Sequence, residues 1–296
     1  MTFDLKSYLA HQQTRVQEAL EKLLPRTDAM PPVLHDSIRY SVLAPGKRLR
    51  PILVLASAEA VGGHSEDVMK TACALECIHA FSLIHDDLPC MDNDDYRRGR
   101  LTNHKVYGDA MALLAGDALL AFAFQLIAEN MDTAPADRIL PTLHLIARAS
   151  GTWGMVGGQV VDMQSQGHDF TPEILQYIHA HKTGALLTAS VLAGAMLCGG
   201  TKAQIDSLKR YGEHIGLAFQ IADDILDITG DQDKLGKPIG SDEERDKATF
   251  PKLFGLEESR RRAHEEVRLA LTTLESFEER AEPLRAIARY IIERDL

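Results

Sequence analysis

The sequence predicts an all-α fold, a single-domain helical bundle around a central apolar cavity that takes in residues 1–296. Apolar residues recur with the helical period in almost every segment, and no sustained β-type alternation with hairpin turns interrupts them. No linker rich in Pro, Gly or Ser divides the 296 residues. Hydrophobic residues make up 45% of the chain, which is enough for a sizeable core.

The first part of the chain predicts three helices. Residues 3–24 carry an amphipathic apolar pattern that stops at Pro25. Pro31 and Pro32 stand where the next helix would begin, because proline is favoured in the first turn of a helix. The apolar stretch 49–61 ends at two glycines, which is a common signal for the C-terminus of a helix.

The rest of the chain continues the helical pattern. Further helices are expected at 66–88, 109–130, 136–165, 172–181, 184–198, 203–229, 243–275 and 280–294. Kinks are expected within 136–165, because this stretch contains Pro141 and four glycines. The loops with the strongest chemical character are 44–50, 89–108 and 230–249.

Composition excludes several classes of protein. The net charge of -11 argues against a general nucleic-acid binder, which needs a basic surplus. The four cysteines follow no metal-ligand or disulfide spacing and are expected to be reduced thiols that pack as small hydrophobic groups: Cys73, Cys77, Cys90 and Cys198.

Two observations bear on the location of the protein. The N-terminus lacks the basic start and apolar core of a signal peptide. Residues 183–201 are uncharged and long enough to raise the question of a membrane span. Their many small residues fit a buried helix with close neighbours better. A cytoplasmic protein that binds neither membrane nor nucleic acid is therefore expected.

Two clusters of aspartates dominate the chain. Asp86, Asp87 and Asp92 follow one apolar stretch, and the second cluster, Asp223-Asp224-x2-Asp227, follows another. Burying unpaired carboxylates costs several kcal/mol per ion, so a cation is expected to meet them. We interpret the two apolar stretches as matching helices that face one cavity. A single acidic helix end is commonly just solvated, but two behind buried helices favour a site.

The spacing within each cluster suits a divalent cation. Asp223 and Asp227 are four residues apart and share a helix face, with Asp224 beside them. Asp86 and Asp92 are six residues apart, off-register for a helix. Proline at 89 should break or bulge the last turn and swing Asp92 back beside Asp86. Carboxylate oxygens with open positions suit Mg²⁺ together with phosphate and water.

Basic side chains are grouped close to these clusters in the sequence. Gly46-Lys47-Arg48-Leu49-Arg50 precedes an apolar helix, where anions bind well, and Arg97-Arg98 follows the first cluster. Lys182, Lys237 and Lys247 flank the predicted aspartate helices. Each alone is more commonly a solvated side chain. Together with the aspartates they predict a site for two phosphorylated groups, one held through metal and one held directly.

Two residues of the first aspartate helix complete the predicted site. His79 lies about two turns before Asp86 and shares its face, although a lone histidine here would more often be a hydrogen-bonded core residue. Phe81 lies about 7–8 Å deeper along the helix than Asp86. It is either plain packing or the floor of a pocket for an apolar tail.

These motifs resemble the trans-prenyltransferases of the isoprenyl diphosphate synthase family over essentially the whole chain. The nearest resemblance is to bacterial-type short-chain farnesyl diphosphate synthases (geranyltranstransferases). It rests on the two aspartate motifs and on five further motifs in the family's order: Gly46-Lys47-Arg48-x-Arg50, His79, Gly157-Gly158-Gln159-x2-Asp162, His181-Lys182-Thr183-Gly184 and Phe219-Gln220.

The resemblance implies roles for individual residues. The implied Mg²⁺ ligands are Asp86, Asp92, Asp223 and Asp227, with Asp87 and Asp224 in support, for about three ions per site that Mn²⁺ would replace. The implied contacts of the allylic substrate are Arg97, Lys182, Thr183, Gln220, Lys237 and Lys247. The implied contacts of isopentenyl diphosphate are Gly46, Lys47, Arg50, His79 and Arg98. Two departures are Asp246, where the family often has Gly, and Leu101, where Pro is common.

The implied reaction is head-to-tail condensation of isopentenyl diphosphate with dimethylallyl and then geranyl diphosphate, giving (2E,6E)-farnesyl diphosphate. Phe81 and the small Ser82 beside it resemble the arrangement for that chain length. A geranylgeranyl diphosphate synthase is the alternative with the same chemistry. More distant alternatives are a terpene cyclase, which needs no second diphosphate site, and a non-catalytic helical subunit. The family also implies a homodimer.

Overall fold

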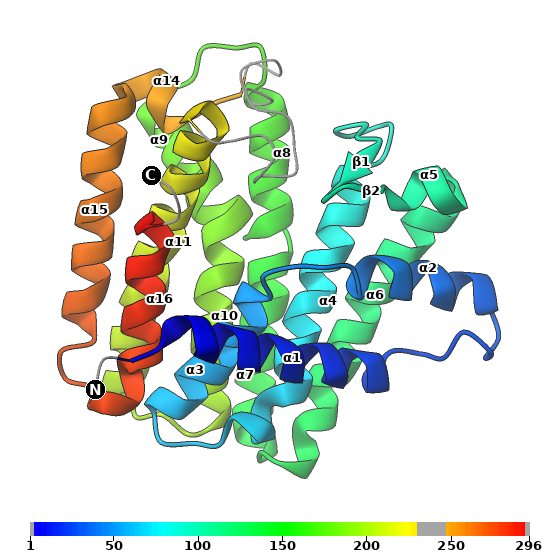
Figure 1. Ribbon diagram of the computed structural model, residues 1–296, viewed down its shortest axis with the longest axis horizontal. Helices are drawn as coiled ribbons and strands as arrows, with labels where there is room; N and C mark the ends of the chain where they lie inside the picture. Colours follow the sequence, from blue (N-terminus) through cyan, green and yellow to red (C-terminus); the bar gives the residue numbers. More distant parts are fainter. Residues whose placement is uncertain (1–2, 230–246, 294–296) are drawn as a thin grey trace.

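The computed structural model describes residues 3–229 and 247–293 and shows an all-α bundle (Figure 1). The α-helices are α1 (Leu5–Leu23), α2 (Pro32–Val42), α3 (Leu49–Ala60), α4 (Met69–Asp86), α5 (Asn103–Tyr107), α6 (Asp109–Ala128), α7 (Ala136–Ser150), α8 (Met155–Ser165), α9 (Pro172–Ile178), α10 (Ala185–Leu197), α11 (Lys202–Thr229), α14 (Phe250–Phe254), α15 (Leu256–Thr273) and α16 (Glu282–Glu293). Short 3₁₀ turns are η1 (Ser65–Val68), η2 (Glu129–Asp132) and η4 (Glu279–Ala281), and a π-helical segment is η3 (His179–Gly184). Within the described ranges, the strands form one two-stranded antiparallel hairpin, β1 (Tyr96–Arg97) with β2 (Arg100–Leu101).

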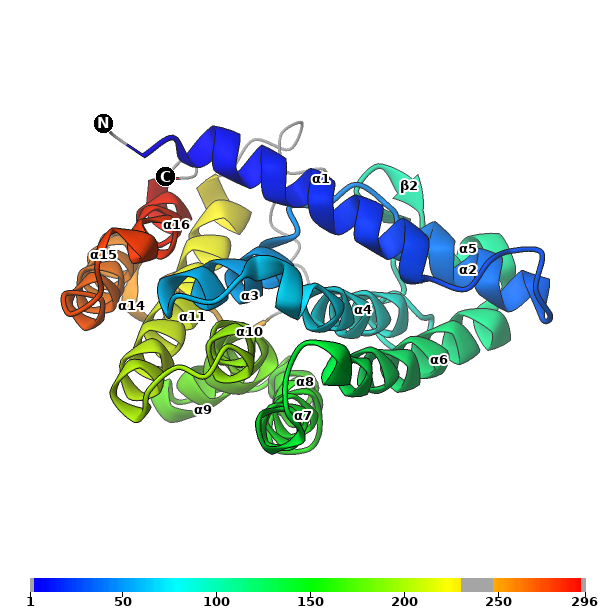
Figure 2. The same ribbon diagram turned by 90° about the horizontal axis from the view of Figure 1, so that it is seen from below.

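Helix α10 lies in the middle of the bundle, beside α3 and α11 (Figure 2). Ten of its thirteen residues are buried. Gly194 allows this packing, because a Cβ there would overlap the carbonyl oxygen of Val54 on α3. The prediction that residues 183–201 form a buried helix with close neighbours is confirmed.

The core has two main parts that meet at α3 and α10. One part joins α4 and α6 with the inner faces of α1 and α2. The other joins α11, α15 and α16. Helix α4 is apolar on nearly every side and has eleven buried residues, as expected for a helix in the interior.

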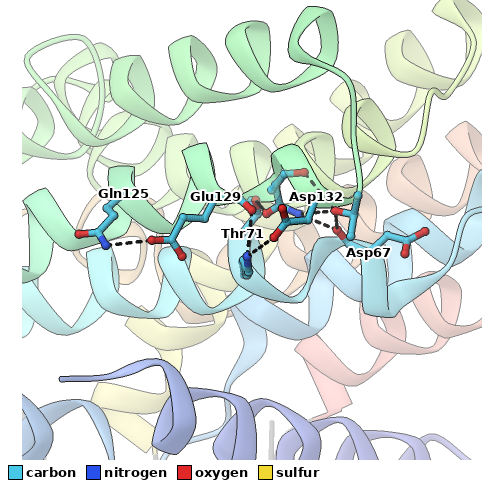
Figure 3. A network of polar contacts seen from close by, with 8 residues as sticks. Asp67, Thr71, Gln125, Glu129 and Asp132 are labelled. Atoms are coloured by element: carbon cyan, nitrogen blue, oxygen red, sulfur yellow. Dashed lines mark hydrogen bonds and ion pairs between the residues drawn. The ribbon is translucent and has the colours of Figure 1, made fainter. Parts of the chain in front are cut away.

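A polar network fixes the opposite, N-terminal end of α4 (Figure 3). The buried Thr71 hydroxyl donates to Asn130 Oδ1 at 2.6 Å, and the Asn130 amide donates to the carbonyl of Asp67 at 2.6 Å. Lys70 pairs with Asp132 at 3.0 Å. These bonds tie the start of α4 to η2 at the end of α6.

Two long helices expected from the sequence are each divided. The stretch 136–165 forms α7 and α8, because the backbone turns at Gly154, where a Cβ would overlap the carbonyl oxygen of Ala149. The helix expected at 243–275 lies partly outside the described residues. Its described part forms α14 and α15, separated by Gly255 with φ of +79°.

Two expectations about single segments need correction or addition. Cys90 is exposed, unlike the buried Cys73 and Cys77, so it does not pack as a core residue. Within the described ranges, the helical stretch Asp109–Asp132 is long and apolar enough to cross a membrane, by length and composition alone. Core helices of soluble proteins meet the same criterion.

Candidate functional site

A cavity of about 480 Å³ opens at the C-terminal end of α4. Its walls come from α4, α8 and η3, with Arg50 of α3 and Leu113 of α6. The lining combines polar and apolar residues. The polar ones are Arg50, His79, Ser82, His85, Asp86, Gln159, Lys182 and Thr183, and the apolar ones are Phe81, Leu83, Leu88, Cys90, Met91, Leu113, Met155, Val156, Val160 and Met163. The predicted chain-length pair, Phe81 and Ser82, therefore lines this cavity.

The first aspartate cluster is arranged as the spacing predicts. After α4 ends at Asp86, the chain turns at Leu88 and returns, and the Asp92 amide donates to the Asp86 carbonyl at 2.8 Å. Asn93 adopts φ of 54° and its amide donates to the Leu88 carbonyl at 3.1 Å. The prediction that Asp92 swings back beside Asp86 is confirmed.

The charge state of Asp86 reflects this crowding. The pKa of Asp86 is raised to about 6, and burial is the largest cause. The carboxylates of Asp92 and Asp87 also raise this pKa, whereas the cations of Lys182 and Arg97 lower it. A cation between Asp86 and Asp92 would relieve both effects. The pair is therefore chemically suited to a divalent ion.

Asp87 points to a different partner. Its buried carboxylate receives the Arg97 side chain, with Nη2 2.6 Å from Oδ1 and Nε donating at 2.7 Å. Arg97 sits on β1, so this fork holds the 89–108 loop against the end of α4. The expected role of Asp87 in support of the metal ligands stays a prediction.

The second cluster is tied to its surroundings through Asp224. Its carboxylate accepts from the Phe250 amide at 2.9 Å and from Gln220 Nε2 at 3.0 Å. Thr183 Oγ1 in turn donates to Gln220 Oε1 at 2.8 Å. This chain of hydrogen bonds joins η3, α11 and the start of α14. Asp227 is also buried, with 2% of its surface exposed, whereas Asp223 is half-buried.

The π-helical segment η3 presents Lys182 to the first cluster. Glycine at 158 lets α8 pack directly on the Lys182 backbone, because a Cβ there would overlap its amide. The Lys182 ammonium lies 2.5 Å from Asp162. Burial would lower the pKa of Lys182, but Asp162, Asp86 and Asp92 outweigh it and raise the pKa above its usual value. π-Bulges occur frequently at functional sites for this reason of side-chain placement.

A basic group, made of Arg50, His79 and Arg98, lies beside the aspartates. Arg98 donates to the Pro45 carbonyl at 2.9 Å, and a Cβ on Gly46 would overlap the Arg98 guanidinium, so the loops 44–50 and 89–108 meet here. Arg50 Nε is buried and has no hydrogen-bond partner among the described residues. Burial and the nearby Arg50 and Arg98 hold the pKa of His79 well below its usual range. The group has donors available for an anion.

Arg50 also connects the two aspartate clusters. Burial lowers the pKa of Arg50, while the carboxylates of Glu76 and Asp223 oppose this effect. Asp223 of α11 thus lies within electrostatic reach of a residue that lines the cavity with Asp86. No described residue of α11 is among those that line this cavity, so the expectation that the two aspartate helices face one cavity stays a prediction.

The donor set fits a metal that is only partly coordinated by protein. Across residues 3–229 and 247–293, no three His, Cys, Asp or Glu side chains converge closely enough to hold a metal ion unaided. Mg²⁺ is typically bound by one or two carboxylates together with substrate phosphates and water. Asp86 with Asp92 supplies such a pair, and the adjacent Lys182 cation suits a phosphate group.

Of the predicted site residues, those that line this cavity are Arg50, His79, Phe81, Ser82, Asp86, Lys182 and Thr183. The other described ones, including Asp92 and the three aspartates of the second cluster, are not among its lining residues. Lys237 lies outside the described residues. Lys247 is half-buried just before α14, whose first amide binds Asp224. Lys47 is exposed and lines a separate hollow of about 580 Å³ between α1, α11 and α16, together with Phe219.

Sequence reasoning missed the polar partners of the predicted residues. Asp162 holds Lys182, and the buried Glu76 pairs with Arg48 at 2.5 Å. His179 stacks on Phe250 and lies 3.4 Å from Asp224. Glu76 had a visible signal, since it is the single charged residue in the apolar stretch 72–84. Asp162 was part of a recognised motif but carried no assigned role.

Comparison with known proteins identifies similar chains. The sequence profile of the family described as polyprenyl synthetase matches residues 31–289. The geranylgeranyl diphosphate synthase of Cyanophora paradoxa is 50% identical over 294 residues, which cover 99% of this chain and 97% of that protein. The dimethylallyltranstransferase of Fischerella ambigua is also 50% identical over 294 residues, covering 99% and 84%. The crystal structure of an FPP/GFPP synthase from Zymomonas mobilis superposes with a TM-score of 0.87 at 39% identity, covering 97% of this chain and 98% of that one.

Proposed function

Since this chain belongs to the polyprenyl synthetase family and is a prenyltransferase, we propose that it condenses isopentenyl diphosphate head-to-tail with allylic diphosphates in a Mg²⁺-dependent reaction. The observation that carries the proposal is the return of Asp92 to Asp86, which lines the cavity together with many apolar residues. That arrangement suits an amphiphile whose diphosphate meets metal and whose hydrocarbon tail enters the cavity.

The allylic substrate would bind with its diphosphate at Asp86 and Asp92. Bound Mg²⁺, held by these residues and by Asp223 and Asp227, would neutralise the diphosphate so that it can leave. Lys182 is well placed to assist, because its ammonium stays protonated and acts on both Asp86 and Asp92. The apolar walls exclude water from the allylic cation that forms when the C1–O bond breaks.

The second substrate would use the basic group. Arg50, His79 and Arg98 would hold the diphosphate of isopentenyl diphosphate, and the free donor of Arg50 supports this. Its double bond attacks C1 of the allylic cation, forming the new C–C bond. The resulting tertiary cation loses a proton to the departed diphosphate. The product of this step is the elongated allylic diphosphate. The dipoles of Thr183 and Gln220 would face the developing charge.

Geranylgeranyl diphosphate is the product that the relatives favour. Besides the Cyanophora paradoxa protein, chloroplast proteins named as geranylgeranyl pyrophosphate synthases are 46–48% identical to this chain. Farnesyl diphosphate remains a second candidate on one observation. The aromatic ring of Phe81 is 6% exposed and lines the cavity, where it would limit the length of a growing tail.

One experiment tests the reaction and the product. The purified protein is incubated with dimethylallyl and radiolabelled isopentenyl diphosphates, with Mg²⁺, with Mn²⁺ and with a chelator, and the products are identified after dephosphorylation. Chain elongation that needs metal and both substrates supports the proposal. Diphosphate release from the allylic substrate alone would instead indicate a cyclase.

A homodimer is the second part of the proposal. Leu114 on α6 is 52% exposed and does not line the cavity, and it belongs to the long apolar helical stretch described above. An exposed apolar helix face of this kind is usually covered by a partner. A second copy related by a two-fold axis would cover the face on both chains at once.

A further inference from the structure

Arg48 and Glu76 form an ion pair buried behind the basic group. Arg48 Nη1 lies 2.5 Å from Glu76 Oε1, and the two side chains are 3% and 5% exposed. Arg48 Nη2 also donates to the Ala44 carbonyl and to Gln17 Oε1, both at 2.8 Å. One guanidinium thereby joins α1, α4 and the 44–50 loop. Removing one partner of such a pair leaves the other charge buried without compensation.

The backbone of Arg48 is bent into an uncommon conformation. Its φ of 52° and ψ of 35° lie in the left-handed region, and it caps the start of α3. A side chain other than glycine persists there only when its surroundings fix it. Here four residues fix it. Glu76, Gln17 and Ala44 bind the guanidinium, and the Ile52 amide donates to the Arg48 carbonyl at 3.1 Å. The turn sends Lys47 and Arg50 to different cavities.

Glu76 is a negatively charged residue that lies among the cations of the basic group, so it cannot bind an anion itself. It is three residues before His79 on α4, and both line a small pocket with Arg48 and Arg98. Its carboxylate acts favourably on Arg50 and on Arg98, whose pKa values burial lowers. Direct contact with a diphosphate would be repulsive. Its charge therefore serves to keep the cations together.

We infer that Arg48 and Glu76 are positioning residues for the non-allylic substrate: their buried pair fixes the turn that aims Arg50 into the cavity and so sets the affinity for isopentenyl diphosphate. The inference rests on the proposed function and deepens it. Neither residue is a substrate ligand. The pair acts through Arg50, and the allylic diphosphate, held at Asp86 and Lys182, does not depend on it.

The test separates the two substrates. The wild-type protein is first assayed with both diphosphates; failure to turn over isopentenyl diphosphate would reject the proposed function, whatever the pair does. In Glu76→Gln we then expect KM for isopentenyl diphosphate to rise about 10-fold, with KM for the allylic diphosphate changed less than about 2-fold. Arg48→Lys keeps the charge without the fork and should show a smaller rise than Arg48→Met.

Two further variants keep the inference open to refutation. The double variant Arg48→Met/Glu76→Leu replaces the pair by apolar groups, so it should fold even if the single variants do not. It should still show the raised KM for isopentenyl diphosphate. Thr71→Val removes a buried hydrogen bond from the same helix and serves as the matched control. An equal rise in Thr71→Val, or an equal rise in both KM values in Glu76→Gln, would overturn the positioning role.

Discussion

The amide of Asp92 donates a 2.8 Å hydrogen bond to the carbonyl of Asp86, the last residue of α4. Six residues of sequence are folded back so that two carboxylates leave the backbone at one place. A backbone hydrogen bond fixes this arrangement. The entropy of bringing the two acids together is therefore spent during folding and not during binding.

Replacing the proline in this turn should separate the two carboxylates. Pro89→Ala restores an amide and lets the helix continue, which would carry Asp92 away from Asp86. We expect kcat to fall about 10- to 100-fold and the Mg²⁺ concentration for half-maximal rate to rise. Steady-state rates against MgCl₂ measure both. Pro32→Ala in the first turn of α2 is the control, and an unchanged Mg²⁺ response in Pro89→Ala would contradict the prediction.

The two adjacent acids of α11 should behave differently when each is neutralised. Asp224 accepts two hydrogen bonds from the protein, so Asp224→Asn should lower the free energy of unfolding by about 1–3 kcal/mol. Asp223→Asn should raise the Mg²⁺ concentration for half-maximal rate, because Asp223 is a proposed Mg²⁺ ligand. Urea unfolding without metal and rates against MgCl₂ check the two effects. Wild-type stability in Asp224→Asn, or a wild-type Mg²⁺ response in Asp223→Asn, would contradict the prediction.

The stability of the metal-free protein should depend on the protonation of Asp86. Its pKa of about 6 in the folded state exceeds that of an unfolded chain, about 4, so the folded state holds an extra proton between these values. The free energy of unfolding should therefore fall as pH rises from about 4 to about 6, by on the order of 1–2 kcal/mol from this group.

Urea unfolding in a chelator at pH 4.5, 5.5 and 6.5 measures this contribution as the difference between wild type and Asp86→Asn. The exposed Asp109→Asn on α6 is the control, and its difference from wild type should stay flat. Added Mg²⁺ should restore stability most at the highest pH. The free energy of unfolding of the wild type relative to Asp86→Asn should fall between pH 4.5 and 6.5. A rise over this range would refute the raised pKa.

Removing the ring of Phe81 should lengthen the product. The ring lines the cavity, so Phe81→Ala opens room for a longer tail, at a stability cost of about 3–5 kcal/mol for a buried phenylalanine. Phe277→Ala removes a ring of similar burial from the other part of the core and is the matched control. Mass spectrometry of the products should show longer chains in Phe81→Ala alone. An unchanged length would reject Phe81 as the floor.

A charge on the exposed face of α6 should dissociate a dimer. Leu114 is 52% exposed and does not line the cavity, so Leu114→Glu changes the face without touching the site. We expect sedimentation velocity to show a dimer for the wild type and a monomer for this variant. Met30→Glu, at an exposed apolar residue elsewhere, should stay dimeric. A monomeric wild type that floats with lipid vesicles would point to membrane contact instead.

The parts of the fold that sequence reasoning predicted are those governed by local pattern. Long apolar periodicity located α4, α10 and α11, and Pro89 predicted the return of Asp92. At Gly154 the sequence predicted only a kink, whereas the structure has a break between two helices. The extent of the turn depends on the contact with Ala149 in the folded chain, which the sequence does not reveal.

The parts that sequence reasoning missed depend on contacts between distant segments. The Phe250 amide that binds Asp224 lies 26 residues away, and Glu76 meets Arg48 across 28 residues. The periodicity of one helix does not reveal which partner on another helix will face it. For the same reason Lys47 was grouped with Arg50, although the left-handed turn between them sends the two side chains into separate cavities.

The π-helical turn η3 sits inside one continuous helical rod, between α9 and α10. A π-turn holds about one residue more than an α-turn, so α10 is out of phase with α9 by about 100°. Deleting any one residue of this turn would straighten the rod and rotate the whole of α10 within the bundle. Insertions and deletions that surface loops tolerate should therefore prevent folding here. Related sequences should keep the length of this segment unchanged.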